Sequence, residues 1–147
     1  MEEPMYRVLI VDDEAMIRTG IKTIMPWKKL GVEQVLLAAS GERAVEQLAD
    51  NSVDLMITDI CMINMDGLEL IAKVNECHPD MRIIVLTGYS SFEYSQQCCR
   101  MNVHDFLLKP IDETELETAI AKQLDILKNR RMQQKQNRTL SRAHGLT

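Results

Sequence analysis

The stretch Leu55–Gly67, LMITDICMINMDG, opens with an apolar run that stops at a single carboxylate, Asp59. A short apolar run bounded by polar and turn residues is typical of a buried strand. Ligands of open α/β sheets bind at the carboxyl ends of parallel strands. Because Asp59 stands at such an end, it is the first candidate for a functional residue.

Four other apolar runs have the same character, and a helix is expected after each of the five, although the fourth helix has only a weak apolar stripe. The expected strands are Tyr6–Val11, Val35–Ala38, Leu55–Thr58, Arg82–Leu86 and Asp105–Leu108. The expected helices follow Asp13 (ending at Pro26-Trp27), Ser40, Gly67, Ser90 (roughly Phe92–Met101) and Asp112. This alternation predicts one α/β domain with a doubly wound, five-stranded parallel sheet and helices on both faces.

The charge of the chain is unevenly distributed. The net charge is -5, but six of the 17 Lys and Arg residues lie from Lys128 onward, where no acid occurs. The remaining 11 basic and 22 acidic residues give positions 1 to 127 a net charge of -11. A last helix that ran from Asp112 to Asn137 would be about 39 Å long and would project beyond a domain of this size.

The sequence shows no apolar run of bilayer length and no apolar leader, so we expect a cytoplasmic protein without a membrane contact. The four cysteines contain no C-x-x-C pair, which favours reduced thiols over a disulfide or a zinc site.

Polar residues end four of the predicted strands: Asp12 and Asp13 the first, Asp59 the third, Thr87 the fourth and Lys109 the fifth. These ends lie along one rim of a doubly wound sheet. Carboxylates packed together repel each other unless a cation lies among them, and a hard ion such as Mg²⁺ takes oxygen ligands. Mg²⁺ also takes phosphate oxygens, so we expect a phosphoryl group at this rim. Asp59 could then act as a nucleophile, while Lys109 and Thr87 contact the phosphoryl oxygens.

These residues resemble the receiver domain of two-component response regulators, the CheY-like family. The resemblance covers about positions 5 to 127 and rests on five short motifs in order at strand ends: Val11-Asp12-Asp13-Glu14, Thr58-Asp59, Met65-Asp66-Gly67, Leu86-Thr87-Gly88 and Leu108-Lys109-Pro110. It implies a flavodoxin-like sheet with the strand order 2-1-3-4-5.

The resemblance also implies the role of each residue around the acceptor. Asp59 would accept a phosphoryl group from a sensor histidine kinase. Asp12, Asp13, Asp59 and the backbone carbonyl of Cys61 would bind Mg²⁺. Lys109 would pair with the phosphoryl group and precede a cis peptide bond to Pro110.

A switch follows from the same resemblance. Thr87 would move toward the phosphoryl group and the ring of Phe106 would turn inward, which would change a surface made of the fourth helix, the fifth strand and the fifth helix. That surface would control an output, with transcription as the expected one, and could mediate a homodimer. The family works as a switch that assists its own phosphotransfer and dephosphorylation, and not as an enzyme.

Two further stretches, Pro26-Trp27 with Leu30-Gly31 and Gly88-Tyr89 with Phe92-Glu93-Tyr94, resemble receivers that precede AraC-type DNA-binding domains. We therefore expect a receiver domain at 5–127 and a basic helical linker or tail at 128–147. DNA would be contacted through an output domain that these 147 residues do not contain. For the basic tail itself, a solvated or linker helix is favoured over nucleic-acid contact.

The same residues allow other interpretations. Each motif alone could be structural, because acids are favoured at helix N-termini and Phe106 could be an ordinary core residue. A haloacid dehalogenase-type phosphatase would need a second acid where this chain has Cys61, and is therefore disfavoured. The remaining alternative is a receiver-like module that binds a partner without phosphorylation. The chain departs from the family pattern at Ile63, which follows Met62 where many receivers have proline. This difference is expected to affect the lifetime of the phosphoryl group more than its attachment.

Overall fold

The computed structural model describes residues 5–60, 62, 67–88 and 100–143, and the side chains of the last helix as far as residue 137. Its strands are β1 (Tyr6–Val11), β2 (Val32–Ala38), β3 (Leu55–Asp59), β4 (Arg82–Thr87) and β5 (Asp105–Leu108). Its helices are α1 (Ala15–Ile24), α2 (Trp27–Leu30), α3 (Gly41–Asp50), α4 (Gly67–Cys77) and α6 (Glu113–Ala143).

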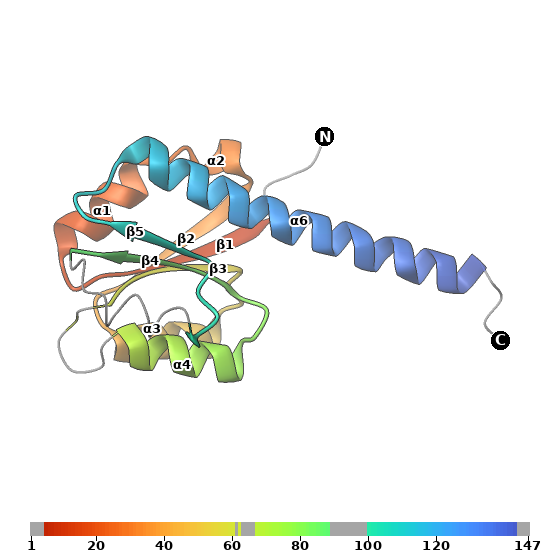
Figure 1. Cartoon of the computed structure of the whole chain (residues 1–147), viewed down its shortest axis with the longest axis horizontal. Coiled ribbons are helices and arrows are strands. Elements are labelled where there is room, and N and C mark those ends of the chain that lie inside the picture. The colour runs from red at the N-terminus through yellow and green to blue at the C-terminus, as the bar shows by residue number, and fades with distance from the viewer. Residues whose placement is uncertain (1–4, 61, 63–66, 89–99, 144–147) are drawn as a thin grey trace.

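The five strands form one parallel sheet in the order β2-β1-β3-β4-β5, which confirms the order that the resemblance to receiver domains implies. Helices α1, α2 and α6 cover one face, and α3 and α4 cover the other (Figure 1). The helix expected after Ser90, at about Phe92–Met101, falls largely outside the described residues.

The sheet is apolar on both faces because alternate strand residues enter two separate cores. Val8 and Ile10 of β1 pack in the cluster under α1 and α6, whereas Leu9 and Val11 pack in the cluster under α3 and α4. Each of these four side chains is at most 1% exposed. This two-sided burial explains why the strands are near-continuous apolar runs.

Strands β3 and β4 each end one residue later than predicted, and the segment between α1 and β2 differs more. A short helix, α2, follows Pro26, and Gly31 ends it in a left-handed conformation with a φ of 87°. The carbonyl oxygen of Gly31 accepts hydrogen bonds from the backbone N–H groups of Met5 and Tyr6, at 3.0 and 3.1 Å. This turn aligns the chain with β1, so β2 begins at Val32 and not at Val35.

Two predicted helix starts are confirmed by their hydrogen bonds. Ser40 Oγ accepts from the backbone N–H of Arg43 at the start of α3, at 3.1 Å. Asp112 Oδ1 accepts from the backbone N–H of Glu115 at the start of α6, at 2.9 Å. Such caps pair amide groups that have no partner within the helix.

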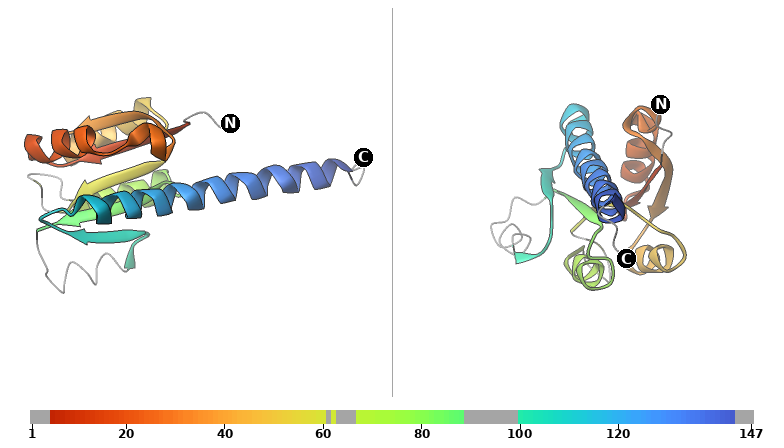
Figure 2. Two further views of the ribbon diagram at one scale, coloured as in Figure 1. Left: turned by 90° about the horizontal axis from the view of Figure 1, so that it is seen from above. Right: turned by 90° about the vertical axis from the view of Figure 1, so that its right-hand side faces the viewer.

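Helix α6 is longer than predicted and runs 31 residues, from Glu113 to Ala143. Its first part packs on the sheet through Leu116, Ile120, Leu124 and Leu127. Its second part projects beyond the domain, as Figure 2 shows from two directions. Among the described residues, no helix is both long and apolar enough to cross a membrane.

Candidate functional site

The predicted site residues meet at one rim of the sheet because the strand register brings their ends together. Val11 pairs with Thr58, so Asp12 and Asp59 follow at the ends of adjacent strands. Asp59 pairs with Leu86, which precedes Thr87, and Thr87 pairs with Leu108, which precedes Lys109. The structure therefore brings Asp12, Asp59, Thr87 and Lys109 together from four strands.

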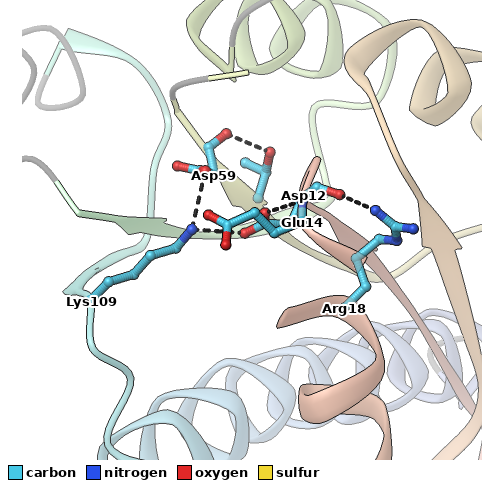
Figure 3. Close-up of polar contacts among 6 residues, drawn as sticks. Asp12, Glu14, Arg18, Asp59 and Lys109 are labelled. Atoms are coloured by element: carbon cyan, nitrogen blue, oxygen red, sulfur yellow. Dashed lines mark hydrogen bonds and ion pairs between the residues drawn. The ribbon is translucent and has the colours of Figure 1, made fainter. Parts of the chain in front are cut away.

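Lys109 joins the two acids directly. Its Nζ donates to Oδ2 of Asp12 at 2.9 Å and to Oδ2 of Asp59 at 3.1 Å (Figure 3). The carboxylate side chains are only 2% and 7% exposed, and that of Lys109 is 15% exposed. Ion pairs that are withdrawn from water in this way are strongly coupled.

The charge state of Lys109 follows from these contacts. Burial by itself would lower the pKa of Lys109, but the hydrogen bond to Asp12 and the charges of Asp59 and Asp12 outweigh burial. The pKa of Lys109 is therefore raised, and the side chain stays an ammonium ion. It can pair with anionic oxygens at neutral pH.

Backbone contacts hold Lys109 and its neighbours at the rim. The backbone N–H of Lys109 donates to the carbonyl oxygen of Thr87 at 2.7 Å, which ties the segment after β5 to the end of β4. The bond between Lys109 and Pro110 is cis, as predicted.

The loop between β1 and α1 carries a group of acids. Asp12 Oδ1 accepts from the backbone N–H of Glu14 at 2.9 Å, and Arg18 Nη1 donates to the carbonyl oxygen of Asp12 at 2.7 Å (Figure 3). Ligand atoms of Asp12, Asp13 and Glu14 lie within 4.8 Å of one another. Asp12 is buried, whereas Asp13 and Glu14 are exposed.

These acids fit a hard divalent cation. Two buried carboxylates, Asp12 and Asp59, share a single ammonium group, and Asp13 and Glu14 add further negative charge. The donor atoms are carboxylate oxygens, the ligands that Mg²⁺ takes in proteins. The sequence prediction includes Glu14 only as part of a motif, without a role at the metal site, and does not include Arg18. The position of Glu14 directly after Asp13 is a sequence feature that could have identified it. The contact of Arg18 with Asp12 depends on where α1 packs and has no such feature.

The backbone of Asp59 and Ile60 lies in close contact with Gly67. The N–H of Gly67 donates to the carbonyl oxygen of Ile60 at 2.6 Å. A Cβ atom on Gly67 would overlap the carbonyl oxygen of Asp59 and lie 2.6 Å from Cα of Ile60. Only glycine fits this contact, which explains the glycine of the Met65-Asp66-Gly67 motif.

The predicted switch residues lie on neighbouring strands. Thr87 is fully buried at the end of β4, and Phe106 is half-buried in β5 against the cluster under α3 and α4. The predicted carbonyl ligand, Cys61, lies outside the described residues, as do Met65, Asp66 and the stretch from Tyr89 to Tyr94.

A family model described as the response regulator receiver domain matches residues 8–121 of this chain. The receiver (REC) domain of AraT, a response regulator from Geobacillus stearothermophilus, has a TM-score of 0.80 and 40% identity, over 86% of this chain and 98% of that one. A two-component transcriptional regulator AraC from Clostridium phytofermentans has a TM-score of 0.77 and 31% identity, over 82% and 94% of the two chains.

A third similar structure is that of the response regulator TrrA from Thermotoga maritima, which was determined in complex with Mg²⁺ and BeF. Its TM-score is 0.70 and its identity 29%, over 81% of this chain and 99% of that one. Curated relatives described as transcriptional regulatory proteins are 35% identical to this chain. The chain spans only 36% to 54% of their length.

Proposed function

Because this chain belongs to the response regulator receiver family of two-component systems, we propose that it is a phosphorylation-driven switch with Asp59 as its phosphoacceptor. One observation carries the proposal: Lys109 lies within hydrogen-bond distance of both Asp59 and Asp12 at the carboxyl ends of the strands. A nucleophile, a cation and a second acid are thus grouped where this fold binds ligands.

The reaction that suits these residues is phosphoryl transfer from a phosphohistidine of a sensor kinase. A carboxylate oxygen of Asp59 forms the new P–O bond, and the P–N bond of the donor breaks with its electron pair remaining on the histidine nitrogen. Lys109 pairs with an anionic phosphoryl oxygen, and Thr87 donates its hydroxyl to another. The chain contributes mainly by positioning these groups, which suits a switch.

We propose Asp12, Asp13, Asp59 and the carbonyl of Cys61 as the Mg²⁺ ligands, and we add Glu14 as a neighbouring acid that reaches the ion directly or through water. When bound, Mg²⁺ offsets negative charge on the phosphoryl oxygens. The buried position of Asp12, its exposed neighbours Asp13 and Glu14, and the Mg²⁺ complex of a similar receiver support this assignment.

The response of the protein would begin at Thr87. Once Asp59 carries a phosphoryl group, the hydroxyl of Thr87 moves toward it and Phe106 turns into the space that is left. Phe106 lies on β5, beside Val85 of β4, so its motion reaches the surface formed by β5, the first part of α6 and the segment before β5. Phosphorylation thereby biases two pre-existing states of this surface.

The partners follow from this role. A sensor histidine kinase would donate the phosphoryl group, a homodimer would form through the switched surface, and an AraC-type output domain would bind DNA. In this arrangement residues 5–127 are the receiver and residues 128–147 are the basic helical linker.

The test is the intact mass of the protein after incubation with acetyl phosphate, with and without Mg²⁺. A single phosphoryl adduct is expected that needs Mg²⁺ and is lost in Asp59→Asn. Asp80→Asn, which changes an exposed acid in a turn, is the matched control and should keep the adduct. A folded protein that forms no adduct under either condition would instead be a receiver-like module that binds its partner without phosphorylation.

A further inference from the structure

A basic groove lies between α2 and α6, on the side of the domain from which α6 projects (Figure 1). Its volume is about 430 Å³. Among the residues that the structure describes, its charged lining is cationic throughout and consists of Lys28, Lys29, Lys128, Arg131 and Lys135. This basic groove is unexpected on a domain whose first 127 residues carry a net charge of -11.

The cations of α6 form a regular row that begins in the groove. Lys128, Arg131 and Lys135 are spaced by three and four residues, which places them on one face of the helix. Arg138 and Arg142 continue the same spacing in the sequence, and no acid follows Asp125. From Lys128 to Arg142 the helix axis advances about 21 Å.

Helix α6 is held at the groove by Arg131. Its Nη2 lies 2.6 Å from Oδ1 of Asp54, and its guanidinium lies 4.7 Å from the centre of the Tyr6 ring. Asp54 is itself fixed to β1, because its Oδ2 accepts from the backbone N–H of Arg7 at 2.9 Å. The row of cations therefore has a defined direction relative to the domain.

Two cations stand on the opposite wall of the groove. Lys28 and Lys29 are exposed on α2, and none of the ion pairs among the described residues involves either of them. Helix α2 contacts α6, so these two lysines add a second line of positive charge beside the row on α6.

We propose that the basic groove and the row on α6 bind the phosphate backbone of duplex DNA. A row of cations at helical spacing suits a polymer with evenly spaced phosphates, and the second part of α6 extends away from the acidic domain (Figure 2). The net negative charge of positions 1 to 127 repels DNA, which favours an approach from the basic face. The biological role of this contact rests on the proposed control of transcription, but the contact itself does not depend on phosphorylation.

The contact is tested by fluorescence anisotropy with the 147-residue chain and a short labelled duplex, over salt from about 50 to about 200 mM. Binding should weaken linearly with log salt. If both lysines contact phosphates, Lys28→Ala/Lys29→Ala should reduce the slope of log K against log salt by about 2. The double variant Lys73→Ala/Lys122→Ala removes the same charge from exposed positions on α4 and on the domain-packed half of α6, and should leave the slope unchanged.

Three results would overturn the proposal: no binding of the duplex at the lowest salt, equal slopes for the two double variants, or tighter lysine-dependent binding of polyglutamate or of anionic lipid vesicles. The last result would assign the basic groove to an acidic protein or to a membrane surface. Circular dichroism verifies that each variant is folded. Phosphorylation of Lys28→Ala/Lys29→Ala by acetyl phosphate, read by mass, should match the wild type, so a failure of DNA binding is distinguishable from a failure of the phosphoacceptor chemistry.

Discussion

The ammonium group of Lys109 lies 3.1 Å from Oδ2 of Asp59, although 50 positions separate the two residues in sequence. The same nitrogen lies 2.9 Å from Oδ2 of Asp12. One cation therefore serves two buried carboxylates that would otherwise face each other. The stability of the domain and the proposed binding of Mg²⁺ would therefore depend on the same charges.

Lys109→Met should destabilise the protein and make its stability depend more strongly on Mg²⁺. The substitution keeps much of the side-chain volume but removes the ammonium group that pairs with Asp12 and Asp59. Breaking a buried ion pair costs about 3–5 kcal/mol. Urea denaturation without metal should show this loss in the free energy of unfolding. Added Mg²⁺ should recover more stability in Lys109→Met than in the wild type.

The control for this experiment is Lys122→Met, which removes an exposed lysine of α6. Its free energy of unfolding should change by less than about 0.5 kcal/mol, with the same Mg²⁺ response as the wild type. If Lys109→Met were as stable as this control in the absence of metal, the ion pairs of Lys109 with the two acids would not stabilise the folded protein, which would contradict the prediction.

Asp13→Asn should reduce the stabilisation that Mg²⁺ gives to the folded protein. An ion that binds only the folded state raises its stability by RT ln(1 + [Mg²⁺]/Kd), so a lost ligand appears as a smaller rise in Tm at fixed Mg²⁺. Thermal unfolding in EDTA and in Mg²⁺ measures both values for each protein. Asp80→Asn should respond to Mg²⁺ like the wild type, and an equal response of Asp13→Asn would remove Asp13 from the proposed ligands.

Much of the site could be predicted from the sequence, because a parallel sheet places all its strand ends at one rim. That rule is enough to group Asp12, Asp59, Thr87 and Lys109. It does not predict that Lys109 contacts both acids, nor that Arg18 reaches the carbonyl of Asp12, since both depend on side-chain directions set by tertiary packing.

The differences in the fold have a similar origin. The start of β2 at Val32 depends on the left-handed turn at Gly31 and on its hydrogen bonds with the segment that leads into β1. These contacts lie far apart in sequence, so local propensity could not reveal them. The short helix α2 contains only four residues, which is too few to show an apolar periodicity in the sequence.

Gly67→Ala should destabilise the protein and disturb the acceptor residue. The new Cβ would overlap the carbonyl of Asp59, so the backbone on one side must move, at a cost of about 1–3 kcal/mol or more. The free energy of unfolding, measured with denaturant, and the rate of phosphorylation by acetyl phosphate should both decrease. Gly20→Ala is the matched control, because a Cβ there meets no atom within 4 Å in an exposed position of α1. It should stabilise the helix by about 0.5–1 kcal/mol.

His104 forms a polar contact at the base of β5, away from the acidic rim. Its Nδ1 accepts from the backbone N–H of Ile83 at 2.9 Å, so that nitrogen must be unprotonated. Burial, followed by the charges of Arg82 and Arg130, lowers the pKa of His104 from 6.5 to about 4. Protonation at Nδ1 would place its N–H opposite the backbone N–H of Ile83, and this hydrogen bond would be lost.

The free energy of unfolding should therefore fall as the pH is lowered through the interval between 6.5, the ordinary pKa, and about 4, the pKa in the folded protein. In this interval the unfolded chain binds a proton that the folded chain does not, so stability rises with pH. The contribution of His104 to the free energy of unfolding is fully present above pH 6.5. Its size is on the order of 2 kcal/mol, which is less than the full pKa difference implies, because solvent reaches part of the ring. Urea denaturation at several pH values measures it for the wild type and for His104→Asn, whose amide oxygen can accept from Ile83 without titrating. The free energy of unfolding of His104→Asn should change less with pH across this interval than that of the wild type. If both proteins changed equally with pH, the dependence would arise from other groups.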